Sequence, residues 1–110
     1  MSAAVRVTLA QARIVPIQPG TQSSLVMQQG SMKFRFYAPR GPDLQRPHEQ
    51  DELYVVASGR GTFFVAGQRV PLEPGDVPFV AAKVEHRFEG FSDDFATWVV
   101  FYGPPGGEPA

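Results

Sequence analysis

The chain has 110 residues, a formal net charge of −1 and no cysteine. This length predicts one domain with a buried core, and the near-neutral charge excludes the strongly basic surface that is typical of nucleic-acid-binding proteins. The lack of cysteine excludes a disulfide framework, thiolate metal ligands and a cysteine nucleophile.

No apolar run approaches the roughly 20 residues that are needed to cross a bilayer. Residues 1–8 lack the charged region and apolar block of a signal peptide. We therefore expect a cytoplasmic protein whose partners include neither nucleic acid nor a membrane.

Residues 1–30 are predicted to form an N-terminal segment that ends in an edge strand. Thr8 and Gln11 have the spacing of a capping box, which predicts a short helix that ends before Pro16. Residues 24–28 are expected to be a strand, and the glycine that follows them predicts a turn into the main domain.

Residues 31–103 are predicted to be a β-domain. In residues 32–37, apolar Met32, Phe34 and Phe36 alternate with the other three side chains, which is the period of a half-buried strand. Eleven glycines and eleven prolines are spread along the chain, which indicates many short strands and tight turns. Further strands are expected at 52–58, 62–65, 69–72, 77–80, 84–88 and 95–102. Residues 104–110 are predicted to be a flexible tail.

The short turns favour antiparallel pairing, so the pattern predicts an all-β sandwich or barrel. Both histidines lie in this domain: His48 is four residues before Glu52, and His86 lies on a later predicted strand. Imidazole and carboxylate are ligand types that suit zinc, iron, manganese and nickel. In extended chain, residues four apart face the same side, so neighbouring strands would bring these three side chains together.

These residues resemble the cupin family, whose first motif is G-x5-H-x-H-x3-4-E-x6-G and whose second is G-x5-P-x-G-x2-H-x3-N. Here His48-x3-Glu52-x6-Gly59 matches the later part of the first motif. The second motif corresponds in spacing to Gly75-x5-Ala81-x-Lys83-x2-His86-x3-Gly90. The resemblance implies a single-domain jelly-roll β-barrel with one divalent metal ion, held by His48, Glu52 and His86.

The chain departs from the family motif at its first histidine position, which is Arg46. A guanidinium stays charged and does not bind metals, so at most three of the four family ligands remain. Arg46 or Arg87 could instead pair with Glu52, which would leave a metal-free barrel. Ala81, Lys83 and Gly90 also replace motif residues, and we expect these changes to alter turn shape only.

The pocket is expected to be walled by aromatic side chains. We name Arg46, Tyr54, Phe36 and Phe88 as candidate pocket residues, with Tyr54 sharing the face of Glu52 and able to donate a hydrogen bond. Arg46 is predicted to point into the barrel, because it has the same parity as His48.

Three functions are compatible with this pattern. The first is a metal-dependent enzyme, dioxygenase-like or isomerase-like, that acts on a small organic molecule. The second is a non-enzymatic protein that binds or senses such a molecule in the same pocket, and the third is a metal-free relic of the barrel. A homodimer is also predicted, because a small open jelly roll leaves sheet edges and apolar outer faces.

Overall fold

The computed structural model describes residues 6–110 and contains one short helix and eight strands. The elements are α1 (Leu9–Arg13), β1 (Ser24–Gln29), β2 (Met32–Tyr37), β3 (Asp51–Ser58), β4 (Gly61–Val65), β5 (Gln68–Leu72), β6 (Phe79–Val80), β7 (His86–Glu89) and β8 (Ala96–Tyr102). The predicted capping box is confirmed: Gln11 N donates to Thr8 Oγ1 at 3.1 Å, and Thr8 N donates to Gln11 Oε1 at 2.8 Å.

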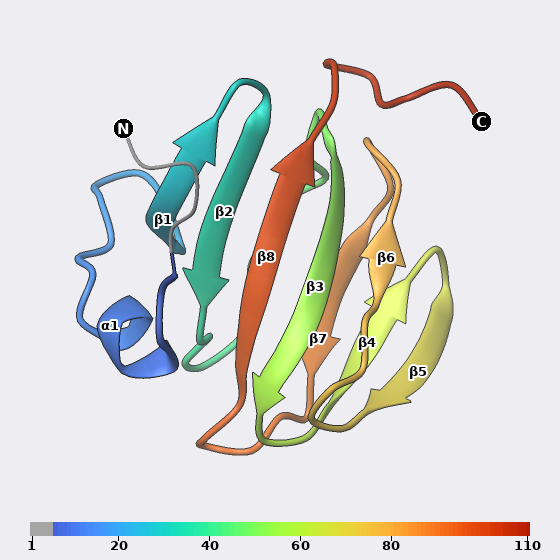
Figure 1. Cartoon of the computed structure of the whole chain (residues 1–110). Coiled ribbons are helices and arrows are strands. Elements are labelled where there is room, and N and C mark those ends of the chain that lie inside the picture. Colours follow the sequence, from blue (N-terminus) through green and yellow to red (C-terminus); the bar gives the residue numbers. More distant parts are fainter. Residues whose placement is uncertain (1–5) are drawn as a thin grey trace.

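The strands form two antiparallel sheets (Figure 1). The larger sheet has the order β1-β2-β8-β3-β6, and the smaller sheet, β5-β4-β7, lies behind its β3–β6 side in this view. The all-β jelly-roll fold predicted from the sequence is confirmed. β1 forms one edge of the larger sheet. None of the helical segments in residues 6–110 has the length and apolar character that crossing a bilayer requires.

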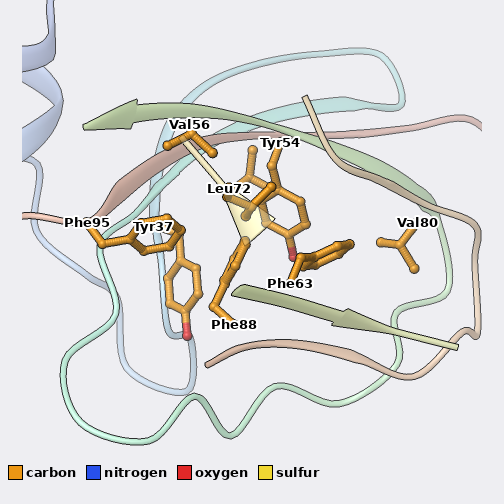
Figure 2. Packing of buried hydrophobic residues seen from close by; sticks show 9 residues of the cluster. Tyr37, Tyr54, Val56, Phe63, Leu72, Val80, Phe88 and Phe95 are labelled. Carbon is orange, nitrogen blue, oxygen red and sulfur yellow. The ribbon is translucent and has the colours of Figure 1, made fainter. Parts of the chain in front are cut away.

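Aromatic rings fill the space between the sheets (Figure 2). Tyr54 of β3 meets Phe88 of β7 edge to face, with 4.9 Å between ring centroids, and Phe63 of β4 lies 5.2 Å from Phe88. All three are at most 2% exposed. Edge-to-face packing of this kind contributes beyond the area that the rings bury, so these rings fix the two sheets relative to each other.

The register across β2, β8 and β3 decides which side chains face the interior. Residues paired across neighbouring strands point to the same side of a sheet. The interior rows, in the order β2, β8, β3, are Lys33–Phe101–Glu52, Arg35–Val99–Tyr54 and Tyr37–Thr97–Val56. β2 therefore directs its polar side chains inward and its apolar side chains, which include Phe34 and Phe36, outward.

Trp98 organises the outer face of the larger sheet. Its ring stacks on Phe34 with centroids 5.3 Å apart and meets Phe36 edge to face at the same distance. Ala12 of α1 packs against Phe36, and the Arg13 guanidinium lies 5.6 Å from the Phe36 ring. Phe34 and Trp98 stay partly exposed. The homodimer stays a prediction, for which this apolar face is the candidate contact surface.

Lys83 adopts a backbone conformation that side chains rarely take, with φ of +69°. This is the motif position at which the family has glycine, which reaches the left-handed region without steric cost. The Lys83 amide donates a 2.6 Å hydrogen bond to the His48 carbonyl. The tight turn is therefore kept without its glycine, and it ties the loop before β7 to the loop that carries His48.

The C-terminal segment, whose flexibility stays a prediction, makes backbone hydrogen bonds to residues at the start of β3. Gly106 N donates to the Glu49 carbonyl at 2.7 Å, and Glu108 N donates to Asp51 Oδ2 at 2.8 Å. Asp51 Oδ1 accepts a further hydrogen bond from Ala82 N at 2.9 Å. The Glu108 amide, and to a lesser degree the Ala82 amide, hold the pKa of the Asp51 carboxyl below its usual value.

Asp51→Asn is expected to destabilise the protein most at neutral pH, because asparagine has one acceptor oxygen for the two backbone donors. A carboxyl with a lowered pKa contributes stability above its unfolded-state pKa, and this contribution is lost as pH falls through the folded-state pKa. The gap in unfolding free energy between wild type and Asp51→Asn should therefore shrink in acid. Urea unfolding over a pH series measures it, with exposed Asp93→Asn as control. A gap that does not change with pH would contradict this account.

Candidate metal centre

His86 opens β7 with its ring held in one orientation. Its Nδ1 lies 2.9 Å from the Val84 carbonyl oxygen, which can only accept, so Nδ1 carries the proton. In the neutral ring, Nε2 then has a free lone pair directed into the barrel. A second ring nitrogen fixed in this way is the arrangement that orients metal-binding histidines.

Glu52 meets His86 from the opposite sheet. Its Oε1 lies 2.9 Å from His86 Nε2 and 3.6 Å from His48 Nε2, and the Glu52 and His86 side chains are each 1% exposed. Despite this proximity, neither Glu52 oxygen nor His86 Nε2 has a hydrogen bond of acceptable geometry within residues 6–110. Burying a carboxylate without hydrogen bonds costs free energy. These atoms therefore call for a partner that residues 6–110 do not supply.

His48 completes the group from the loop before β3. Its ring packs edge-on against Phe101, with centroids 5.0 Å apart, and its side chain is 34% exposed. The candidate ligand atoms of His48, Glu52 and His86 all lie within 4.8 Å of one another. The structure thus brings together the three residues that the sequence predicted as ligands.

These residues fit a divalent transition metal. Each of them offers an atom that can bind a cation, and two imidazoles with one carboxylate leave open positions for water or another ligand. A cation would also supply the missing partner of the buried Glu52 oxygens. No ion pair joins Arg46 or Arg87 to Glu52 in the described part of the chain; Arg87 pairs with Glu85 and Glu89 instead.

In the metal-free protein, the pKa values of the two histidines are shifted in opposite directions. Burial lowers the pKa of His48, and the Glu52 carboxylate offsets this only in part. Burial also opposes the charge on His86, but the adjacent Glu52 carboxylate outweighs it and the pKa of His86 is raised. Protons therefore compete with metal mainly at His86.

Sequence reasoning missed a buried polar network beside the ligands. Asp43 accepts hydrogen bonds from Tyr37 Oη at 2.5 Å and from Gln45 Nε2 at 2.8 Å. Because the Gln45 amide nitrogen faces this carboxylate, its Oε1 must face the site, where it accepts from Tyr54 Oη at 3.1 Å and lies 3.2 Å from His48 Nε2. The only sequence signal was the nearness of Asp43 and Gln45 to the motif, which is weak because both residue types are common in loops.

The predicted pocket residues fall into two groups. Tyr54 and Arg46 both line a cavity of about 550 Å³ that opens beside the ligands. Tyr54 is fully buried, and its pKa is raised by burial and then by the Glu52 charge, so its hydroxyl keeps its proton and donates. Arg46 is exposed at the rim of this cavity rather than buried among the ligands.

The two phenylalanines lie elsewhere, which corrects their prediction as pocket walls. Phe36 points to the outer face of the larger sheet, because its parity is opposite to that of Arg35 and Tyr37. Phe88 is packed in the core between the sheets (Figure 2). Its backbone contributes instead, since Phe88 N donates to Asp43 Oδ2 at 2.8 Å.

We expect Glu52→Gln to stabilise the metal-free protein when His86 is neutral. The glutamine amide can donate to His86 Nε2, whereas the carboxylate only faces its lone pair, so the free energy of unfolding should rise by about 1–3 kcal/mol. A histidine with a raised pKa contributes stability below its unfolded-state pKa and loses that contribution as pH rises through the folded-state pKa. The advantage of the variant should therefore appear at high pH and fade on acidification.

Urea unfolding in the presence of a chelator, from acidic to alkaline pH, measures this difference. Glu49→Gln is the matched control, because Glu49 is an exposed carboxylate three residues away. If Glu52→Gln is less stable than wild type at every pH, then Glu52 is satisfied by the protein and the interpretation of its unpaired oxygens is wrong.

Comparison with known proteins identifies the family and the fold. The family model described as "Cupin domain" matches residues 33–102. The uncharacterized protein SCO3923 of Streptomyces coelicolor is 42% identical over 62 residues, which cover 56% of this chain and 59% of that relative. This chain thus matches less than two thirds of the length of that curated relative.

Solved structures share the fold at low sequence identity. A protein of unknown function from Rhizobium leguminosarum bv. viciae 3841 has a TM-score of 0.72 at 21% identity, covering 92% of this chain and 98% of that one. A candidate mannose-6-phosphate isomerase from Ralstonia eutropha JMP134 has a TM-score of 0.60 at 22% identity, covering 83% and 93%. With the family model matched over most of its length, the chain belongs to the cupin family.

Proposed function

We propose that this cupin binds one divalent metal ion through His48, Glu52 and His86 and uses it to act on a small organic molecule in the adjacent cavity. The observation that carries the proposal is the convergence of three ligand atoms, two of them on fully buried side chains without hydrogen-bond partners. When bound, such a metal supplies a Lewis acid, or a centre that activates oxygen, at the floor of the cavity.

The chain itself supplies binding and orientation. The cavity of about 550 Å³ is lined by His48, Glu52 and Tyr54 at its floor, so a molecule held there reaches the open side of the ligand group. Asp43 fixes the Gln45 amide, which in turn holds the Tyr54 hydroxyl and the face of His48. A ligand atom that displaces the Gln45 contact would meet a proton donor at Tyr54. The aromatic core beneath the site excludes water from its buried side.

Metal loading tests the proposal directly. Protein is purified without a His-tag, stripped with chelator and loaded with zinc, iron, manganese and nickel in turn. It should retain about one equivalent of at least one of these metals after desalting. His86→Ala and Glu52→Gln should lose most of this metal, because each removes one of three ligands, whereas Glu49→Gln should retain it. Elemental analysis gives the stoichiometry. If the wild type holds none of the four metals above trace amounts, the proposal is wrong.

A non-enzymatic binding protein would use the same pocket, so turnover must be measured separately. Mannose 6-phosphate is the first probe, because a candidate isomerase of this sugar shares the fold. Metal-loaded protein is incubated with it and followed by phosphorus NMR. Product that forms only with metal, and not in Glu52→Gln, would establish an enzyme. Saturable binding without product would favour the binding protein.

A further inference from the structure

β2 directs cationic side chains into the barrel, which is unusual for the concave face of a small β-domain. Lys33 and Arg35 share the inward face of β2 with buried Tyr37, and both are only partly exposed. The apolar alternation of the same strand faces outward onto Trp98. Placing charges on the inner face costs free energy unless they gain partners, so this orientation calls for a compensating group.

The protein supplies little of that compensation. Arg35 Nη1 donates to the Ser23 carbonyl at 3.1 Å and lies 3.5 Å from Ser23 Oγ, which leaves the other donors of its guanidinium free for a ligand. Within residues 6–110, no carboxylate lies within ion-pair distance of Lys33, Arg35 or Arg46. All three cations line the same cavity as His48 and Glu52.

The sheet register sets the distance between the cations and the ligand group. Lys33 lies in the same row as Glu52 and Arg35 in the same row as Tyr54, with β8 between them. Two strand spacings separate β2 from β3, so the backbones of Lys33 and Glu52 lie about 10 Å apart. Phe101 and Val99 of β8 form an apolar strip between the two ends. The cavity therefore has a metal-binding end, an apolar middle and a cationic end.

We infer that the cavity selects a small organic anion with two polar ends: one that reaches the metal, and a carboxylate or phosphate that binds Arg35 and Lys33, with Arg46 at the rim. This inference rests on the proposed function, since the first end requires the metal. A planar guanidinium with free donors suits a carboxylate or phosphate, which it can bind through two parallel hydrogen bonds. The net charge of −1 for the whole chain makes this a local anion site rather than a basic surface.

Matched ligands isolate the cationic end. Dicarboxylates from succinate to adipate are compared with their monoamides, which keep one carboxylate for the metal and lose the second charge. The ω-phosphono carboxylic acids of equal chain length form a third series and distinguish phosphate from carboxylate recognition. Dissociation constants for zinc-loaded wild type are measured by calorimetry at constant ionic strength, in a buffer without carboxylate or phosphate.

For at least one chain length, the dianion should bind about tenfold more tightly than its monoamide, since a charge-assisted hydrogen bond replaces a neutral one. Arg35→Gln and Lys33→Gln should each reduce this ratio and leave the affinity for the monoamide nearly unchanged. Arg60→Gln is the control for net charge. Arg60 is an exposed residue in the turn after β3, and it pairs with Glu73.

Two results would overturn the inference: equal affinity of wild type for every dianion and its monoamide, or a ratio that survives in the Arg35→Gln, Lys33→Gln double variant. The wild-type comparison decides the matter even if a variant fails to fold. Zinc loading is measured before any ligand is added. A wild type that binds no zinc contradicts the proposed metal site, whereas a loaded wild type that ignores the second charge contradicts only the present inference.

Discussion

The contact between Glu52 and His86 is the constraint on which the rest of the site depends. It joins the two sheets, since Glu52 lies on β3 and His86 on β7, and both side chains are 1% exposed. Because Val84 fixes the proton on His86 Nδ1, the neutral His86 ring turns a lone pair toward the Glu52 carboxylate, 2.9 Å away. The cost of this arrangement is offset in one of two ways: by a second proton on His86, which its raised pKa favours, or by a bound metal ion.

The surrounding fold maintains this contact. Tyr54, Phe63 and Phe88 pack the two sheets against each other (Figure 2), so the carboxylate and the imidazole cannot move apart without opening the core. The same register that directs Glu52 inward also directs Lys33 and Arg35 inward two strands away. One alignment of three strands therefore places two of the candidate metal ligands and a group of cations in a single cavity, while the apolar face of β2 is turned outward.

Much of the fold could be predicted from the sequence, because glycine, proline and period-2 alternation are local signals. The alternation in residues 32–37 predicted β2 at its observed bounds, and the motif spacing indicated the three candidate ligand residues that the structure brings together. Which face of β2 is inward could not be predicted, because alternation alone does not say which side meets the core. Phe36 was placed in the pocket for that reason. The Asp43–Gln45 network was missed because it depends on contacts between a loop and distant strands.

The central claim is that both histidines present Nε2 to one metal ion, and the chain is suited to a direct test because it contains only two histidines. Nitrogen-detected NMR of histidine-labelled protein resolves the tautomer and ligation of each ring. In the metal-free protein at alkaline pH, where the ring is neutral, His86 should be the Nδ1–H tautomer, as its contact with the Val84 carbonyl requires. One equivalent of zinc should shift Nε2 of both rings together. If zinc leaves either ring unchanged, or shifts His48 alone, then His48 and His86 do not share a metal and the account is wrong.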